Sequence, residues 1–326
     1  MGIQFEGVDY RYEDGGTSVA ALSSISLSFE PGRFTAVVGA PGSGKSTLLQ
    51  HMNGLLMPSA GIVRIGEAVI GPDTQEKSLG PIRKRVGLVF QYPERQMFEE
   101  TVLRDLTFAP LNFGMTPAEA EQAARAAALR LGLDAHVLAS SPFRLSSGQL
   151  RKAAIAAVLA ADPDVFVLDE PTASLDPLSR REVMALLASL CREDGKTLIV
   201  VTHRLDEVLP YADELVVMQA GRAVSHGPAM QVAADRVTLA AAGVPLPAGL
   251  ALIEALSVGN ATLLGKVGRL PINADEMAES IAAWLYGSAA VPDADAGAEL
   301  AGESADAARK PGQAGAAEMP NTEEEP

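Results

Sequence analysis

The sequence predicts an α/β protein that is built on a parallel β-sheet and carries a phosphate-binding loop. Short, continuous apolar runs are typical of strands covered on both faces, and they lie at residues 35–38, 165–168, 198–201 and 215–218. Helical patterns alternate with these runs, which is the order of elements in a parallel sheet. A glycine-rich run follows the first strand directly.

The N-terminal part, residues 3–71, is rich in strand patterns. Residues 24–29 alternate polar and apolar side chains, which indicates a half-exposed antiparallel strand. Pro31 and Gly32 then form a turn into the strand at 35–38. Residues 62–65 are a further short apolar run. We therefore expect an antiparallel β subdomain beside the parallel sheet.

The glycine-rich run fits the phosphate-loop pattern G-x-x-x-x-G-K-[ST] at every fixed position. It comprises Gly39, Ala40, Pro41, Gly42, Ser43, Gly44, Lys45 and Ser46, and Thr47 follows it. Glycines let backbone N–H groups wrap around phosphate oxygens, and the helix predicted at 47–52 adds a favourable dipole. Lys45 can then reach the β and γ phosphates, and Ser46 can hold Mg²⁺. A glycine-rich turn without a ligand would not need both the strand and the helix around it.

Residues 93–162 are predicted to form an inserted helical subdomain. Residues 118–131 are rich in alanine, with charged residues spaced to give one exposed face. Residues 147–161 form a second helical pattern, which begins with small polar residues and ends before Pro163. The strand patterns resume after this block.

The C-terminal part is predicted to contain a small extension and a disordered tail. We place the boundaries at 1–228 for the main domain, 229–287 for the extension and 288–326 for the tail. Helices are expected near 250–256 and 274–285. The tail has nine acidic and two basic residues and almost no large apolar side chains, so it cannot bury enough surface to fold.

Charge and cysteine content exclude several classes of protein. The formal net charge of −15 argues against binding to nucleic acid. The single cysteine, Cys191, excludes an internal disulfide and a thiolate metal cluster. Its expected role is packing on the helix that contains residues 181–190.

No membrane-targeting segment is expected. The start of the sequence has neither a basic segment nor an apolar run of the kind that marks a signal peptide. The longest charge-free apolar stretch, residues 237–253, contains Pro245 and Pro247 and is too irregular to be a spanning helix. Work at a membrane would therefore require docking.

Three further groups could act on a bound phosphate. Asp169 and Glu170 end the strand at 165–168, where one carboxylate can position Mg²⁺ and the next can polarise an attacking water. Residues 145–149 place a Ser-Gly turn at a helix start, which is a second anion site. His203 follows the strand at 198–201 and can reach a γ-phosphate. Each group alone is more often structural, so only their combination points to phosphate chemistry.

In this order, the motifs resemble the nucleotide-binding subunit of ATP-binding cassette (ABC) transporters over residues 3–228. The resemblance implies a P-loop NTPase fold: a RecA-like core with an antiparallel β subdomain, an inserted helical subdomain and a small C-terminal extension. The loop at 39–47 matches Walker A. Residues 165–170 match Walker B, with Glu170 as the catalytic carboxylate and Asp169 at the metal. Residues 174–176 match the D-loop.

The same resemblance assigns the remaining groups. Tyr12 matches the aromatic residue that stacks on adenine, although Tyr10 could serve instead. Gln91 matches the Q-loop glutamine, which touches Mg²⁺ and the docking surface. His203 matches the switch histidine, which with Glu170 and Lys45 completes the catalytic set. The signature motif corresponds to Leu145, Ser146, Ser147, Gly148 and Gln149.

The signature contains one departure from the family pattern. Ser147 stands where the family usually has glycine, which suits a close approach of backbone to phosphate. In this family the signature faces the nucleotide of the partner subunit. Any effect of the serine is therefore expected at the partner's site, while the chain's own Walker residues are complete.

A closer resemblance points to the energy-coupling factor (ECF) ATPases, in particular the second of their two types. It is carried by residues 90–102, 108–110 and 112–114, which read FQYPERQMFEETV, FAP and NFG. Residues 48–56 and 243–245 also resemble that family, in particular its second type. In that family the segment after the Q-loop forms a short helix against a transmembrane coupling subunit. The ATPase of another ABC importer class is the alternative.

The ECF resemblance implies a cofactor, a location and a set of partners. ATP with Mg²⁺ would be bound between this chain and a second ABC ATPase subunit in a head-to-tail pair. The ECF likeness favours a pair of two different chains. The other partners would be a transmembrane coupling subunit and a substrate-binding membrane protein. The cargo would be a vitamin or a transition-metal ion. The chain would lie at the cytoplasmic face of the cell membrane as a peripheral protein and would not bind nucleic acid.

Two other function classes remain as alternatives. A GTPase would carry an Asn-Lys-x-Asp guanine reader, which the sequence lacks, and a small-molecule kinase has no use for the motif at 145–149. ABC proteins that act on ribosomes or DNA usually have two cassettes in one chain or a long coiled coil. This chain has one cassette and an acidic balance.

Overall fold

The structure is a computed structural model that describes residues 1–92, 96–173, 175–256, 271 and 274–286. It divides into two compact units, Met1–Ile272 and Asn273–Pro326. The predicted acidic tail at 288–326 lies outside the described residues, as do residues 93–95 and Ser174 of the predicted D-loop. The boundary between domain and extension at 228 and 229 stays a prediction.

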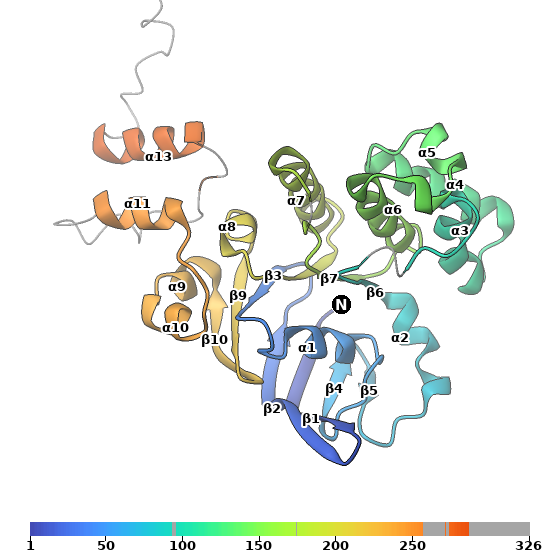
Figure 1. Cartoon of the computed structure of the whole chain (residues 1–326), viewed down its shortest axis with the longest axis horizontal. Coiled ribbons are helices and arrows are strands. Elements are labelled where there is room, and N and C mark those ends of the chain that lie inside the picture. Colours follow the sequence, from blue (N-terminus) through green and yellow to red (C-terminus); the bar gives the residue numbers. More distant parts are fainter. Residues whose placement is uncertain (93–95, 174, 257–270, 272–273, 287–326) are drawn as a thin grey trace, which may run out of the picture. The chain divides into compact units, whose positions relative to one another are not determined.

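The first unit contains the expected parallel sheet (Figure 1). Its strand order is β10-β9-β3-β8-β7-β6, with parallel pairing except between β10 and β9. All four predicted strands are confirmed, and β3, β8 and most of β7 and β9 are buried, as their apolar runs indicated. The strands are β3 (Phe34–Val38), β6 (Val86–Val89), β7 (Val165–Asp169), β8 (Thr197–Val201), β9 (Glu214–Gln219) and β10 (Arg222–Pro228).

An antiparallel sheet of four strands, in the order β2-β1-β4-β5, completes the core. Apolar residues of alternating positions, such as Phe5 opposite Leu27, point into a cluster that also contains Leu48 and Leu49 of the first helix and Val37 and Val167 of the parallel sheet. That helix thus packs within the same core as both sheets. The elements are β1 (Ile3–Asp14), β2 (Thr17–Phe29), β4 (Ala60–Ile65), β5 (Ala68–Ile70) and α1 (Lys45–Met52).

The expected helical insert follows β6 and is drawn in green in Figure 1. Thr116 caps α4 with a reciprocal Thr–Glu119 box, and the alanines of its inner face are buried, so small side chains allow close packing on α3 and α6. Thr101 caps α3, and the preceding residues 96–101 form turns and bends. The elements after β5 are η1 (Glu76–Ser78), α2 (Gly80–Arg85), α3 (Val102–Asn112), α4 (Pro117–Arg130), α5 (Ala135–Ala139), η3 (Pro142–Arg144) and α6 (Ser147–Leu159).

The remaining helices follow the later strands. Cys191 is buried near the end of α7, and its thiol donates to the carbonyl of Gly32 at 3.3 Å, which confirms its packing role. No described helix is long and apolar enough to cross a membrane. The helices are α7 (Pro177–Arg192), α8 (Leu205–Val208), α9 (Ala229–Ala233), α10 (Arg236–Ala241), α11 (Ala248–Leu256) and, in the second unit, α13 (Ala274–Tyr286).

Candidate nucleotide site

The phosphate loop joins β3 to α1 and needs glycine at specific positions. Gly39 has φ +154°, and a Cβ there would lie 2.2 Å from the carbonyl oxygen of Met218. Gly44, at the start of α1, has φ +99°, and a Cβ would lie 2.6 Å from the carbonyl oxygen of Ala21. Any side chain at either position would therefore push the loop away from its neighbouring strands.

Lys45 is folded over its own loop. Its Nζ donates to the carbonyl oxygens of Gly39 and Ala40, both at 2.8 Å, and to Ser43 Oγ at 3.3 Å. Burial lowers the pKa of Lys45, while the nearby carboxylates of Glu170 and Asp169 act in the opposite direction. A polyphosphate would supply stronger, charged acceptors for the same ammonium group.

A cavity of about 550 Å³ opens over this loop. It brings together residues from the two sheets, the loop and the ends of β7 and β8, which are far apart in the sequence. Most of the predicted nucleotide and metal residues therefore lie at one place. The lining residues are Tyr12, Val19, Ala20, Ala21, Pro41, Gly42, Gly44, Lys45, Ser46, Thr47, Gln91, Asp169, Glu170 and His203.

Asp169 ends β7 inside this cavity. Burial raises its pKa and the neighbouring Glu170 raises it further, whereas the hydrogen bond from Ser46 and the charges of Lys45 and Arg151 lower it. The described residues contain no group of three or more His, Cys, Asp or Glu side chains arranged for a metal. One carboxylate and one hydroxyl are the protein ligands that Mg²⁺ takes when phosphate oxygens and water supply the rest, so Asp169 and Ser46 fit that ion.

Glu170 is held in a defined position at the end of β7. It is buried, its φ is +49°, and its backbone N–H donates to the carbonyl oxygen of Val201 at 2.9 Å. The carboxylate accepts from Thr202 Oγ1 at 3.0 Å and from the backbone N–H of His203 at 2.9 Å, and it lies 2.6 Å from His203 Nδ1. A positive φ at a non-glycine residue is a conformation that the surrounding structure must maintain.

The structure separates the two tyrosines that could meet the base. Tyr12 is 41% exposed, lines the cavity and lies 3.2 Å from Thr47 Oγ1 through its hydroxyl. Tyr10 is not among the lining residues and packs edge-on between Tyr12 and His51, with ring centroids 4.9 and 4.8 Å apart. Of the two, Tyr12 is therefore the tyrosine that faces the cavity, and Tyr10 packs against its ring.

The signature residues lie at the start of α6 and do not line this cavity. Ser146 caps the helix: its hydroxyl accepts from the backbone N–H of Gln149 at 3.3 Å, and the Gln149 side chain accepts from the backbone N–H of Ser146 at 3.1 Å. Ser147 is exposed and does not have a positive φ, so serine adopts this backbone without strain. Gly148 is the next residue of the same first turn.

Several residues of the site carried no signal in the sequence. Thr202 anchors Glu170, and Arg151 donates to the carbonyl oxygen of Gln91 at 2.8 Å. The backbone N–H of Ala40 donates to the carbonyl oxygen of Ala242 at 2.9 Å, so the end of α10 supports the phosphate loop. A threonine and an arginine inside ordinary strand and helix patterns, and a backbone contact across 200 residues, follow from tertiary structure only.

Comparison with known proteins places these motifs in one group. A family model described as ABC transporter matches residues 22–173. The energy-coupling factor transporter ATP-binding protein EcfA2 of Enterococcus faecalis is 44% identical over 282 residues, which cover 86% of this chain and 96% of that protein. The EcfA2 protein of Latilactobacillus sakei is 48% identical over 257 residues, 78% of this chain and 88% of that protein.

Solved structures agree in fold. The protein cbiO1 from Clostridium perfringens, part of the ABC transporter complex cbiONQ, matches with a TM-score of 0.64 and 35% identity over 77% of this chain and 98% of that chain. The ATP-binding cassette MJ0796, solved as a dimer in a post-hydrolysis state with ADP and Pi, matches with a TM-score of 0.65 and 28% identity, over 70% of this chain and 98% of that chain. The predicted α/β nucleotide-binding fold is therefore confirmed.

Proposed function

The chain belongs to the ABC transporter family, among the ATP-binding proteins of energy-coupling factor transporters, and from this premise we propose that it powers the uptake of a vitamin or a transition-metal ion. It is an ATPase subunit that couples ATP hydrolysis to transport. The observation that carries the proposal is the cavity in which the phosphate loop, Asp169, Glu170 and His203 meet.

Within this site each residue has a proposed role. Tyr12 stacks on adenine, and the loop N–H groups and Lys45 hold the phosphates. Ser46, Asp169 and Gln91 would hold Mg²⁺, which supplies charge neutralisation at the β and γ phosphates when it is bound.

Glu170 and His203 are the proposed reaction residues. The oxygen of the attacking water bonds to the γ-phosphorus while the bond from that phosphorus to the ADP oxygen breaks. Glu170 accepts the proton that the water loses. His203 exchanges its hydrogen bond with Glu170 for one to the γ-phosphate. Both roles require the carboxylate at the end of β7 and the imidazole after β8 to share one cavity, and they do.

The chain works as a dimer with a membrane partner, and we propose that the dimer partner is a different ATPase chain. Ser146 to Gln149 lie outside the chain's own cavity, which supports a head-to-tail pair in which each signature faces the other subunit's nucleotide. Ser147 would then act on the partner's ATP. A composite pair of this kind is the arrangement that the family resemblance implies.

A second cavity supports docking to a transmembrane coupling subunit at the cytoplasmic face of the membrane. It measures about 320 Å³ and is mostly apolar, and it lies between β6, α3 and α6. Phe98 and Phe108 are among its lining residues and form an edge-on pair, with ring centroids 4.9 Å apart, and they are 57% and 45% exposed. Both belong to the segment that follows Gln91, so a helix seated here would be linked directly to the nucleotide site.

The experiment that tests this function is isolation of the chain, tagged at its N-terminus, from its native membranes in a mild detergent. We expect a second cassette ATPase, one coupling membrane protein and one or more small substrate-binding membrane proteins, the last of which identify the cargo. A dedicated pair of permeases would instead indicate another ABC importer class. Recovery without any membrane protein, or together with ribosomes or nucleic acid, would contradict the proposal.

A further inference from the structure

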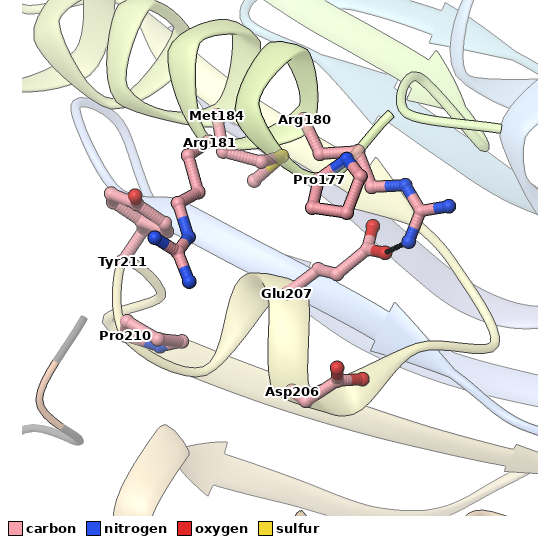
Figure 2. Close-up of a pocket in the computed structure, with 8 residues that line it drawn as sticks. All are labelled: Pro177, Arg180, Arg181, Met184, Asp206, Glu207, Pro210 and Tyr211. Carbon is pink, nitrogen blue, oxygen red and sulfur yellow. Dashed lines mark hydrogen bonds and ion pairs between the residues drawn. The ribbon is translucent and has the colours of Figure 1, made fainter. Parts of the chain in front are cut away.

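One partly buried carboxylate, that of Glu207 on α8, connects three segments around the nucleotide site. It accepts from Thr172 Oγ1 at 2.5 Å, from Arg204 at 2.8 Å and from Arg180 at 3.2 Å. Figure 2 shows its carboxylate pointing toward the Arg180 guanidinium of α7, with the contact drawn as a dashed line. No dashed line reaches Asp206 or Arg181 among the residues drawn there.

Each of the three donors is linked in turn to a proposed catalytic residue or to the D-loop. Thr172 lies in the turn after β7, where the backbone N–H of Ala173 donates to the carbonyl oxygen of Glu170 at 3.1 Å. The Arg180 Nε donates to the carbonyl oxygen of Leu175 at 2.7 Å, which fixes α7 to the D-loop. Through these bonds Glu207 is connected to two parts of the segment after Glu170: to Thr172 directly and to Leu175 through Arg180.

The third donor leads back to the carboxylate itself. Arg204 follows His203, and its backbone N–H donates to Thr202 Oγ1 at 3.1 Å. The same Thr202 hydroxyl donates to Glu170 Oε2 at 3.0 Å. The bonds therefore form a closed path from Glu170 through Thr202, Arg204 and Glu207 to Thr172 and the turn after Glu170.

The environment makes this path stiff. The Glu207 side chain is only 10% exposed, and a carboxylate removed from water is stabilised only when its oxygens keep charged or hydroxyl donors in good geometry. Three donors on two oxygens meet that need, and they leave little freedom for any one segment to move alone. Displacement of the D-loop would therefore be transmitted to the end of β8.

We propose that Glu207 is a positioning residue for ATP hydrolysis, which keeps Glu170 and His203 in a fixed position relative to the D-loop. Glu207 does not line the nucleotide cavity, so it acts through Thr172, Arg180 and Arg204 and not on ATP. The inference rests on the proposed roles of Glu170 and His203. It predicts that loss of the Glu207 charge slows turnover and leaves ATP binding intact.

The test uses the intact transporter complex carrying Glu207→Gln, Arg180→Gln or both, with kcat, KM for ATP, affinity for an ATP analogue and Tm measured for each. Displacement of a catalytic group by about 1 Å reduces rate by up to roughly 100-fold, so we expect kcat of Glu207→Gln to fall about 10- to 100-fold with KM within about twofold. Because the Arg180–Glu207 ion pair is shared by the two side chains, the double variant should lose less than the product of the two separate effects.

Two pairs of variants serve as controls. Asp206→Asn and Arg181→Gln remove the same charges from the neighbouring positions of α8 and α7, and both should keep wild-type kcat. Thr172→Ser keeps the hydroxyl that binds Glu207 and should retain most activity, while Thr172→Val removes it at equal size and should lower kcat. The threonine pair tests the path even where Glu207→Gln does not fold.

Three results would overturn the inference. The first is a kcat for Glu207→Gln that lies within twofold of wild type. If Glu207→Gln does not fold, the same criterion applies to Thr172→Val. The second is a loss of ATP affinity that accounts for the whole effect. The third is multiplication of the separate effects of Glu207→Gln and Arg180→Gln. Glu170→Gln measured alongside separates the cases: if it is inactive while Glu207→Gln is normal, only the positioning role fails, and if both are normal the proposed catalytic site fails.

Discussion

His203 contacts the proposed catalytic carboxylate through two nitrogens: its Nδ1 lies 2.6 Å from Glu170 Oε1, and its backbone N–H donates to the same oxygen at 2.9 Å. The imidazole proposed to contact the γ-phosphate is thus in contact with the carboxylate proposed to activate water. An ionised carboxylate has about four acceptor sites, and three contacts from Thr202 and His203 already surround that of Glu170, so release of the imidazole would free an acceptor site for the proton of the water. ATP binding is the event that offers the imidazole another acceptor.

Replacement of Glu170 by glutamine is expected to leave ATP binding within about twofold of wild type. It should lower kcat by roughly 10²- to 10⁴-fold, the usual contribution of a general base. Glutamine keeps the acceptor for Thr202 and His203 N–H but cannot take up the proton. Single-turnover hydrolysis with radiolabelled ATP measures the effect, and near-normal turnover by a folded variant would remove Glu170 from this role.

Replacement of Lys45 by alanine should weaken both ATP binding and turnover. A hydrogen bond to a charged group contributes about 1.5–3 kcal/mol, so the affinity for ATP should fall roughly 10- to 150-fold. Titration calorimetry with ATP measures this loss. Lys152→Ala removes a partly exposed lysine that pairs with Glu182 outside the nucleotide cavity and is the control. Equal affinity for the wild type and Lys45→Ala would contradict the phosphate-binding role.

The two neighbouring tyrosines should respond differently to substitution. Loss of base stacking is worth about 1–3 kcal/mol, so Tyr12→Ala should weaken ATP binding roughly 5- to 150-fold, whereas Tyr12→Phe should retain it. Tyr10→Phe keeps the edge-on packing with His51 and should also retain it. A fluorescent ATP analogue measures all three affinities. Binding by Tyr12→Ala as tight as by the wild type would contradict the assignment of Tyr12 to the base.

The buried carboxyl group of Asp105 on α3 is expected to make the stability of the folded protein depend on pH. It is 5% exposed, one oxygen accepts from the backbone N–H groups of Phe98 and Glu99, and among the described residues its Oδ2 has no hydrogen-bond partner. Burial raises its pKa above the ordinary value of 3.8. The folded state therefore binds this proton more tightly than the unfolded state, and stability is lost as pH rises through the interval above 3.8.

Asp105→Asn removes this loss. Its Tm should exceed that of the wild type at pH 7, and the difference should shrink as pH falls toward 4, where the wild-type carboxyl also becomes neutral. Calorimetric scans of both proteins at several pH values measure the difference. Glu121→Gln, which removes an exposed acid from α4, is the control. A Tm difference that does not depend on pH would contradict the role of burial.

The docking proposal predicts a specific loss of assembly. Phe98→Ser together with Phe108→Ser should reduce recovery of the coupling membrane protein and leave ATP binding unchanged, because neither ring lines the nucleotide cavity. Phe143→Ser removes a ring that is 73% exposed but lies outside the apolar cavity, and it should not affect assembly. Quantitative immunoblotting after mild solubilisation compares the three proteins, and equal recovery would place the membrane contact elsewhere.

Much of the fold was predictable because its signals are local. Continuous apolar runs marked β3, β7, β8 and β9 to within one residue at either end, and small polar residues marked the start of α6. The order of the strands, with β3 between β8 and β9, was not predictable, since only the packing of distant segments determines which runs become neighbours. The choice of Tyr12 over Tyr10 depended on that packing in the same way.

The residues of the site likewise fall into those with a local sequence signal and those defined only by tertiary contacts. Glycines and a lysine at fixed spacing identify a phosphate loop, because the backbone geometry that binds phosphate permits few other residues. Thr202, Arg151 and Glu207 each make side-chain contacts with residues 22 to 61 positions away in the chain, and nothing in their local sequence distinguishes them from ordinary residues. Positioning groups are therefore the part of a site that a single sequence hides.

The buried Cys191 has a practical consequence for measuring movement in this protein. It is the only cysteine in the chain, and burial raises the pKa of its thiol, so the reactive thiolate is scarce. A cysteine introduced at an exposed position, such as Leu178 beside the D-loop, would be the readily labelled thiol of this subunit. Fluorescence labelling can therefore follow opening and closing of the transporter in real time without prior removal of the native thiol.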